Sequence, residues 1–239
     1  MKFEETVARR LSDNPYVLGF DPINEPVGVF KNFLGIVDYL IPGKWDKMLL
    51  EPFYSRVYET LAKVNKRNIM FFEATLPDWF SLTLGSWQVY TDVKPQGYSR
   101  PPGSKYESGS VRHVTHDHSY CCTLNYDVCK EHDEPHPRWA NQCKEYHEQR
   151  LAQRNDDAIK LGIPLFITEF GACMGSESCA TEIRQVADAC DKYLVSWAYW
   201  QFKKFKDITT TAMGAAEGFY NDDGSLQVLK TKALTRTYI

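Results

Sequence analysis

The sequence predicts an α/β protein, because short apolar stretches alternate along it with longer amphipathic ones. About four strand–helix units can be counted, and this alternation is typical of a parallel sheet. A hydrophobic content of 43% with 14% aromatic residues is sufficient for a sizeable core. Four strands cannot close an eight-stranded barrel, which takes about 250 residues with its helices. The 239 residues are therefore expected to form either a small open α/β domain or part of a larger fold.

In the first half of the chain, two helix–strand pairs are expected. Residues 3–11 are amphipathic and lead into an apolar stretch over 16–20. Apolar residues then recur at helical spacing over 53–64, ahead of a second apolar stretch over 69–72. Each pair is interpreted as a helix followed by a strand. A polar stretch rich in proline and glycine, over 92–109, separates these two pairs from the second half of the chain.

The second half of the chain continues the alternation. The expected elements are a strand over 112–122, a helix over 138–161, a strand over 163–168, a helix over 181–191, a strand over 193–200 and a final helical segment from 225 onward. Gly162 follows the longest of these helices, and a glycine there can adopt the left-handed conformation that ends a helix. Alternation along the first of the strands puts His116, His118 and Tyr120 on one face.

Charge and hydropathy exclude two classes of protein. A formal net charge of -3 and a pI near 6.1 leave no basic excess to neutralise phosphates, so no nucleic-acid partner is expected. The most apolar stretch, residues 27–41, is interrupted by Lys31 and Asp38 and falls short of the roughly 20 apolar residues that a membrane span requires. The opening MKFEETVARR has acidic residues early and lacks the apolar run of a secretory signal.

The cysteine content favours an oxidising compartment, because seven cysteines are many for a cytosolic enzyme of this size. Several of them lie in expected loops, where a disulfide can close. An odd number leaves at least one thiol unpaired within the chain. The seven are Cys121, Cys122, Cys129, Cys143, Cys173, Cys179 and Cys190.

Two glutamates have the same placement at expected strand ends, far apart in the chain. Asn24 and Glu25 end the strand in LGFDPINEP, and Glu169 closes the strand in LFITEFGA. Barrel enzymes keep their catalytic groups at the carboxyl ends of strands. If two carboxylates come within about 5 to 5.5 Å, one can attack an anomeric carbon while the other protonates the leaving oxygen. The alternative is that each is an ordinary solvated carboxylate.

Other residues carry a chemical interpretation beside a structural one. His116 and His118, followed by Cys121 and Cys122, offer donors for zinc, although their spacing matches no common structural zinc pattern. Glu73, in FFEATLPDW, is a third strand-end carboxylate that shapes the cleft or binds substrate, or is a buried hydrogen-bonded glutamate. Core packing is the alternative for the aromatic residues near the last strand, Tyr193, Trp197, Tyr199 and Trp200.

Four short motifs in order, NEP, HSY, TEFG and SWAYW, resemble glycoside hydrolase family five. The longer strings GFDPINEP, FEATLPDW, DHSYC and WAYWQFK resemble its endoglycoceramidase branch, over nearly the whole chain. The resemblance implies that residues 1–239 are a partial catalytic (β/α)8 TIM barrel, without the first three βα units and the C-terminal β-sandwich. It also implies that residues 26–50 are an apolar loop or helix inserted after the fourth strand.

Site roles follow from the same resemblance, position by position. Glu25 matches the general acid/base, Glu169 the nucleophile, and Asn24 the residue that binds the sugar 2-hydroxyl. His118 and Tyr120 match the family's strand-six pair, with Tyr120 near the nucleophile. The aromatic floor under the sugar is matched by Trp200.

The implied function is that of a retaining endo-β-glycosidase, which cleaves the glycan–ceramide bond of glycosphingolipids. No metal or organic cofactor is expected, since carboxylates supply both the nucleophile and the proton. Alternatives are another family-five β-glycosidase, namely a glucosylceramidase, cellulase or exo-β-glucanase, and an inactive glycolipid-binding relative. The apolar residues over 29–50 are expected either to contact ceramide, a membrane or a micelle, or to pack as an amphipathic helix.

The resemblance also implies what the chain lacks. The family supplies an arginine and a histidine from its second and third strands, which are absent here. Met1 is therefore expected to be an internal start, and the isolated chain to fold poorly or to be inactive. The location expected for the protein is secreted, extracellular or lysosomal.

Overall fold

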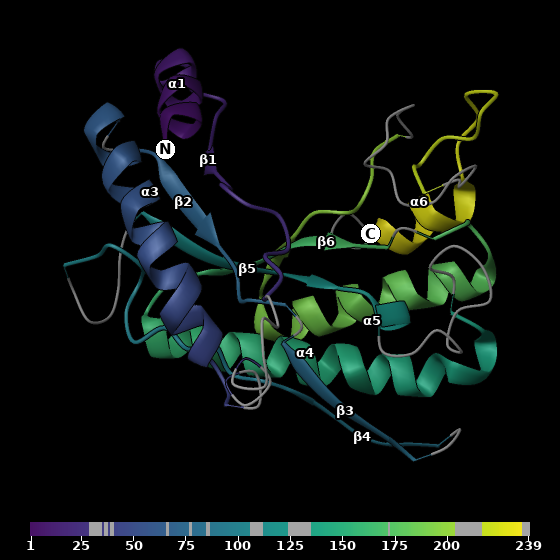
Figure 1. Ribbon diagram of the computed structural model, residues 1–239. Helices are drawn as coiled ribbons and strands as arrows, with labels where there is room; N and C mark the ends of the chain where they lie inside the picture. Colours follow the sequence, from purple (N-terminus) through teal and green to yellow (C-terminus); the bar gives the residue numbers. More distant parts are fainter. Residues whose placement is uncertain are drawn as a thin grey trace. The chain divides into compact units, whose positions relative to one another are not determined.

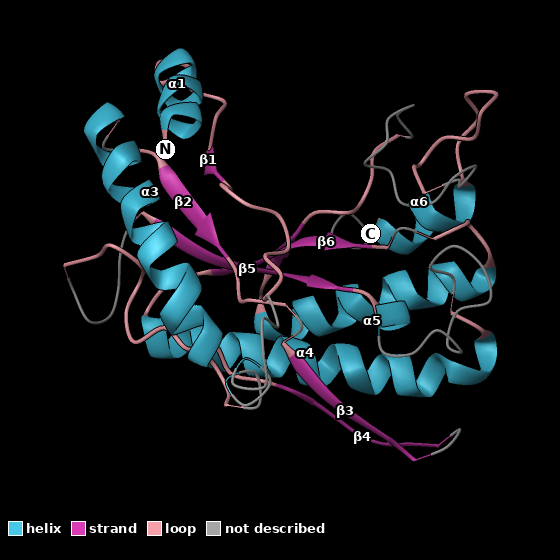
Figure 2. Cartoon of the chain, in the orientation of Figure 1, coloured by secondary structure: helices cyan, strands magenta, loops and turns pink. Residues whose placement is uncertain are grey.

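The computed structural model forms two compact units (Figure 1). The first comprises residues 1–117 and 153–166, and the second comprises residues 118–152 and 167–239. Helices and strands alternate along the chain (Figure 2), as predicted for an α/β protein. The structure describes residues 1–28, 35, 38, 41–65, 67–76, 78–84, 87–105, 112–123, 135–171, 173–203 and 217–235.

In the first unit, three parallel strands lie in the order β1, β2, β5. Their bounds are Gly19–Phe20, Ile69–Phe72 and His113–Ser119, and β5 continues into the second unit after Asp117. The predicted strand over 69–72 is confirmed. The strand predicted over 16–20 is wrong at its start, because Tyr16 is 93% exposed and pairing begins only at Gly19. There the backbones approach so closely that a Cβ on Gly19 would lie 2.3 Å from the carbonyl oxygen of Ile69.

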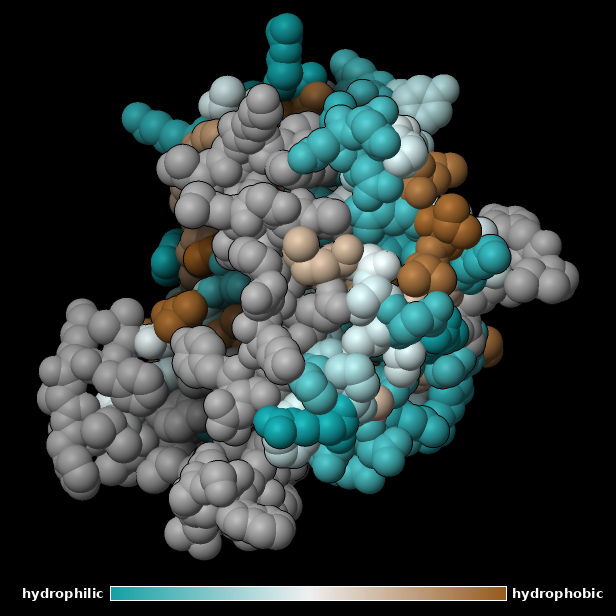
Figure 3. Space-filling view, turned by 90° about the vertical axis from the view of Figure 1, so that its right-hand side faces the viewer, coloured by the Kyte–Doolittle hydropathy of each residue, from teal (hydrophilic) through white to brown (hydrophobic). Residues whose placement is uncertain are grey.

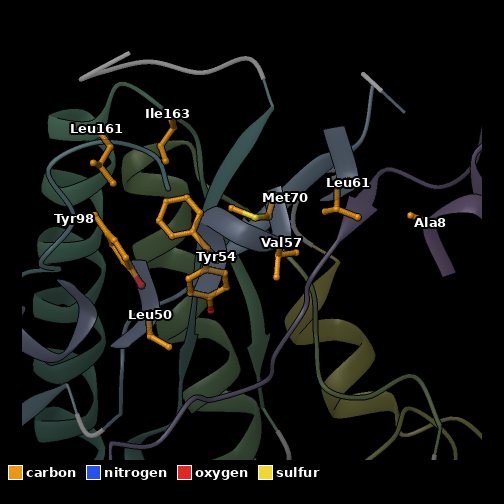
Figure 4. Close-up of a cluster of buried hydrophobic side chains, with 10 residues drawn as sticks. Ala8, Leu50, Tyr54, Val57, Leu61, Met70, Tyr98, Leu161 and Ile163 are labelled. Atoms are coloured by element: carbon orange, nitrogen blue, oxygen red, sulfur yellow. The ribbon is translucent and has the colours of Figure 1, made fainter. Parts of the chain in front are cut away.

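The helix α3 (Glu51–Val64) packs against β2 and runs alongside it in Figure 1. The helix α1 (Lys2–Leu11) and the π-helix η1 (Asp46–Leu50) pack against α3. Both predicted helices are confirmed, and the buried residues of α3 keep the expected spacing. The core cluster that results (Figure 4) consists of Ala8, Leu50, Tyr54, Val57, Leu61, Met70, Phe72, Tyr98, Leu161 and Ile163.

An antiparallel hairpin lies between β2 and β5 in the sequence, and the sequence interpretation missed it. Its strands are β3 (Trp79–Leu84) and β4 (Trp87–Val93), with an irregularity between Leu82 and Thr83. The polar stretch assigned to 92–109 therefore begins inside β4. Gly-Ser between two alternating runs is a hairpin signal that was available in the sequence.

The second unit contains the rest of β5, followed by helices and short strands. These elements are η2 (Cys121–Thr123), η3 (Pro137–Trp139), α4 (Ala140–Leu161), β6 (Leu165–Phe170), α5 (Glu177–Tyr193), β7 (Ser196–Trp197) and α6 (Val228–Leu234), of which α4 and β6 extend into the first unit. The helix predictions are confirmed, and Gly162 has the expected positive φ of 64°. The strand predictions are less accurate: β6 begins after Pro164, which cannot donate a ladder hydrogen bond, and β7 is only two residues long.

Disulfides join the segments that follow β5 and β6 to helices in the second unit. Cys121 is bonded to Cys143 in α4, and Cys173 is bonded to Cys179 in the first turn of α5. Cys122 is disulfide-bonded as well. The thiol predicted from the odd count is confirmed as Cys190, which is fully buried in α5.

Opening the Cys121–Cys143 disulfide should lower the free energy of unfolding by about 3 kcal/mol, since the bond closes a loop over a sequence separation of 22 residues. We expect the Cys121→Ser, Cys143→Ser double variant to unfold at lower denaturant concentration than the parent protein, with both measured by circular dichroism. Equal midpoints would show that the loop is held by its other contacts.

Figure 3 shows one face, on which the described side chains are mainly hydrophilic and the hydrophobic ones gather in small separate groups. Among the described residues, no helix combines the length and the apolar character that crossing a bilayer demands. Ten of the 25 residues in the apolar segment predicted over 26–50 lie outside the described residues, which there include the exposed Ile41 and the π-helix η1.

Candidate active site

Glu25 lies in a bend that follows β1. The strand ends at Phe20, so the prediction that Asn24 and Glu25 end the strand itself is wrong. Pro22 has no N–H to donate, which prevents regular pairing from continuing. Asn24 is exposed and Glu25 is half-buried, and the backbone of Glu25 has a φ of +46°.

A buried carboxylate holds the backbone of this bend. Oε1 of Glu73, the first residue after β2, accepts a hydrogen bond of 2.5 Å from the backbone N–H of Glu25. The following residues pair in parallel, because Leu76 donates to the carbonyl of Pro26 at 2.7 Å and Gly28 donates to the carbonyl of Leu76 at 2.9 Å. The segments after β1 and β2 are thus joined through both the N–H and the carbonyl of Leu76.

Glu73 is itself fixed by two core tyrosines. Its backbone N–H donates to the hydroxyl of Tyr54 at 3.3 Å, and the hydroxyl of Tyr98 donates to its carbonyl at 2.9 Å. Burial, followed by the charge of nearby carboxylates, raises the pKa of both phenols well above their ordinary value, which keeps them protonated. Glu73 is 2% exposed, and this agrees with its interpretation as a buried, hydrogen-bonded glutamate.

In the second unit, the carboxylate of Glu169 is held at the end of β6. Its Oε2 accepts a hydrogen bond of 3.1 Å from the hydroxyl of Tyr120 and lies 3.5 Å from Nδ1 of His118. The side chain of Glu169 is 17% exposed, so the carboxylate is largely shielded but accessible. Two groups from the end of β5 therefore contact one oxygen of this carboxylate and restrict its orientation.

Behind the end of β5 lies a buried polar network that the sequence interpretation missed. The hydroxyl of Ser119 lies 2.7 Å from Nδ1 of His147, and Nε2 of that histidine lies 3.6 Å from Glu182. The same glutamate accepts a hydrogen bond of 3.2 Å from the backbone N–H of Cys121. The network thus supports the residues on either side of Tyr120.

Arg150 adds a contact to the same segment, because its Nε donates a hydrogen bond of 2.7 Å to the carbonyl of His118. Arg150, like His147, is buried on α4. Both residues stand in the sequence KEYHEQR, which resembles an ordinary polar helix face. No spacing in the sequence distinguishes them, since their partners come from distant elements.

Gly171 allows the chain after Glu169 to pass close to an aromatic ring. It has a φ of +103°, and a Cβ there would lie 2.1 Å from the ring of Tyr199. Gly171 also forms a parallel bridge with Trp200, whose N–H donates to the carbonyl of Phe170 at 3.0 Å. Trp200 is half-buried and lies next to the end of β6.

Replacing Gly171 with alanine should lower the free energy of unfolding by about 1–3 kcal/mol, because the new Cβ meets both an unfavourable φ and the ring of Tyr199. A thermal melt measures this change. Gly224→Ala is the matched control, since Gly224 also has a positive φ but nothing in the described structure lies within 4 Å of its Cβ position. Equal losses for the two variants would show that the contact with Tyr199 contributes nothing.

The structural alternatives are confirmed for two other groups of residues. Trp197 and Tyr199 pack edge-to-face on the buried Phe170, with ring centroids at 5.5 and 5.7 Å, so they are core aromatics. The zinc interpretation is wrong as far as it used thiolates, because Cys121 and Cys122 are both disulfide-bonded.

The predicted site residues thus fall into two groups. Asn24 and Glu25 belong to the first unit, and Glu25 is held there by Glu73. Glu169 belongs to the second unit, where His118 and Tyr120 contact it. Convergence of Glu25 and Glu169 on one sugar stays a prediction.

Known proteins resemble this chain over nearly its whole length. The chain is 25% identical over 241 residues to an endoglycoceramidase of Hydra vulgaris, covering 99% of the chain and 37% of that protein. The endo-glycoceramidase II of Rhodococcus sp. in complex with ganglioside GM3 superposes with a TM-score of 0.69 at 18% identity, over 97% of this chain and 44% of the other. A hyperthermophilic endo-β-1,4-glucanase with bound substrate gives a TM-score of 0.60 at 18% identity, over 98% and 64%.

The chain therefore spans less than half the length of the two endoglycoceramidases that it resembles. Its fold is the part of a (β/α)8 barrel that these structures share with it. A model of the cellulase domain of glycosyl hydrolase family 5 matches residues 1–206. The chain belongs to glycosyl hydrolase family 5.

Proposed function

We propose that the chain is the catalytic part of a retaining endo-β-glycosidase that cleaves the glycan–ceramide bond of glycosphingolipids. The observation that carries this proposal is the geometry around Glu169, whose Oε2 is held by Tyr120 at 3.1 Å and by His118 at 3.5 Å. A nucleophilic carboxylate must keep a fixed orientation toward the anomeric carbon. Membership of family 5 supports the assignment of this carboxylate to glycoside hydrolysis.

The proposed reaction proceeds in two displacements. A carboxylate oxygen of Glu169 attacks the anomeric carbon while the carboxyl proton of Glu25 passes to the leaving oxygen, so ceramide departs as a neutral alcohol. The ionised Glu25 then takes a proton from water, which attacks the same carbon and releases Glu169. The glycan is released with its anomeric configuration retained.

Glycolipid is favoured as substrate by the relatives that the chain resembles. The Hydra protein is an endoglycoceramidase, and the Rhodococcus enzyme has been captured with ganglioside GM3 and as a lactosyl-enzyme intermediate. The glucanase supports a second candidate, hydrolysis of β-1,4-glucan, since its fold matches to a similar extent. Product analysis separates the candidates.

For this experiment, the product of the complete transcript is incubated with a ganglioside, with glucosylceramide and with cello-oligosaccharides. Release of an intact oligosaccharide and ceramide from the ganglioside is the expected result. Release of glucose from glucosylceramide alone, or cleavage of cello-oligosaccharides alone, would replace the proposal with a simpler glycosidase. Retention of glycolipid without turnover would point to a binding protein.

We also propose that the protein is secreted or lysosomal and that it contacts a membrane or micelle peripherally while acting on its substrate. The disulfides Cys121–Cys143 and Cys173–Cys179 support an oxidising compartment. Fractionation of cells that express the product of the complete transcript tests the location. Recovery of the protein in the cytosol with reduced cysteines would contradict it.

A further inference from the structure

We infer that Glu73 is a positioning residue for Glu25: its buried carboxylate holds the backbone of the bend and thereby aims the acid/base side chain. This inference rests on the proposed function, in which Glu25 donates the proton. It deepens that function by adding a group that acts on the proton donor through the backbone.

The backbone of Glu25 occupies a conformation that it would not adopt by itself. A φ of +46° places it in the left-handed region, which is unfavourable for residues with a Cβ. The next residue is Pro26, and a proline ring favours extended backbone in the residue before it. Without another constraint, the backbone of Glu25 would therefore shift to a negative φ, and its side chain would point in a different direction.

The hydrogen bond to Glu73 opposes this relaxation. Glu25 N lies 2.5 Å from Oε1 of Glu73, and a carboxylate is a stronger acceptor of a backbone N–H than a neutral oxygen is. Because Glu73 is 2% exposed, water competes little for this acceptor, and an unmade bond would leave polar groups poorly solvated.

Glu73 can act as an anchor because its own backbone is held on both sides. Tyr54 accepts from its N–H and Tyr98 donates to its carbonyl. Figure 4 shows both tyrosines within the core cluster. Their rings contact the ring of Phe72 edge-to-face, at centroid distances of 5.9 Å for Tyr54 and 5.1 Å for Tyr98. The position of Glu25 is thus tied to the hydrophobic core through Glu73.

The test compares two substrates, one whose leaving group needs a proton and one whose leaving group does not. A positioning role should lower activity on the first substrate only, whereas a general structural role should lower activity on both. We expect Glu73→Leu to lower kcat/KM by about 100-fold on a ganglioside, whose alkoxide leaving group needs a proton. On 2,4-dinitrophenyl β-lactoside the leaving group needs no proton, and added azide attacks in the second step in place of base-activated water. The loss of kcat/KM on this substrate should therefore stay within about threefold. Glu73→Gln keeps the length and an acceptor oxygen, so it should recover most of the ganglioside activity.

Asp46→Leu is the matched control, because Asp46 is also a buried carboxylate that accepts backbone hydrogen bonds in the first unit, from Thr75 at 2.7 Å and Gly97 at 2.8 Å. It should affect both substrates equally. Equal losses on both substrates for Glu73→Leu, or the same selectivity in Asp46→Leu, would overturn the positioning role. If Glu25→Gln itself shows no dependence on the leaving group, the acid/base assignment fails, and the inference fails with it.

Discussion

Glu169→Gln should lower kcat/KM by at least about 10⁴-fold on every substrate, because a neutral amide cannot form the glycosyl-enzyme ester. Glutamine keeps the length of the side chain and can still accept the hydrogen bond from Tyr120, so the fold should be unaffected. Steady-state kinetics measures the loss. Mass spectrometry of the protein after reaction with a 2-deoxy-2-fluoro glycoside should show a covalent adduct in the parent protein and none in the variant.

Glu148→Gln is a suitable control, since Glu148 lies on α4 in the same unit and forms an exposed ion pair with Lys144 at 3.8 Å. Its kinetics should match those of the parent, because an exposed ion pair contributes little to stability. An adduct on a different residue, or substantial turnover by Glu169→Gln, would remove Glu169 from the reaction.

Glu25→Gln should have an effect that depends on the leaving group. On a ganglioside we expect kcat/KM to fall by about 10³-fold, because a general acid contributes roughly 10²–10⁴ when an alkoxide must be protonated. On a dinitrophenyl glycoside the first step should proceed almost unchanged, since that leaving group departs as a stable anion. Added azide should then restore turnover and give a β-glycosyl azide, because an anionic nucleophile needs no base.

The control for this variant is Glu5→Gln, which removes an exposed carboxylate from α1 in the same unit. It should leave both activities unchanged. Equal losses on the two kinds of substrate for Glu25→Gln, without rescue by azide, would contradict the acid/base role.

Sequence reasoning succeeded where the signal is local. The strand over 69–72 is a short apolar run, and Gly162 is a residue suited to a left-handed cap, so both could be predicted. Glu169 lies at the end of β6, as its motif indicated. In each case the neighbouring residues in the sequence are sufficient to predict the feature.

Features that depend on distant partners could not be predicted in this way. A strand was expected over 16–20, but β1 contains only two residues, because its extent depends on which residues pair with β2 and not on local hydropathy. The burial of Glu73 was among the sequence interpretations, but its hydrogen bond to Glu25 depends on a distant partner. His147 lies in a sequence that resembles an ordinary polar helix face, although it contacts Ser119 at the end of β5. The hairpin of β3 and β4 is different, since its turn signal was present and was overlooked.

At position 25, local backbone stability and the proposed reaction favour different residues. Local stability at position 25 would be improved by glycine or asparagine, which tolerate a positive φ. The proposed reaction instead requires a long acidic side chain there. Stabilising substitutions chosen only by backbone preference would replace the proposed proton donor at position 25. Position 25 should therefore be excluded when such substitutions are chosen.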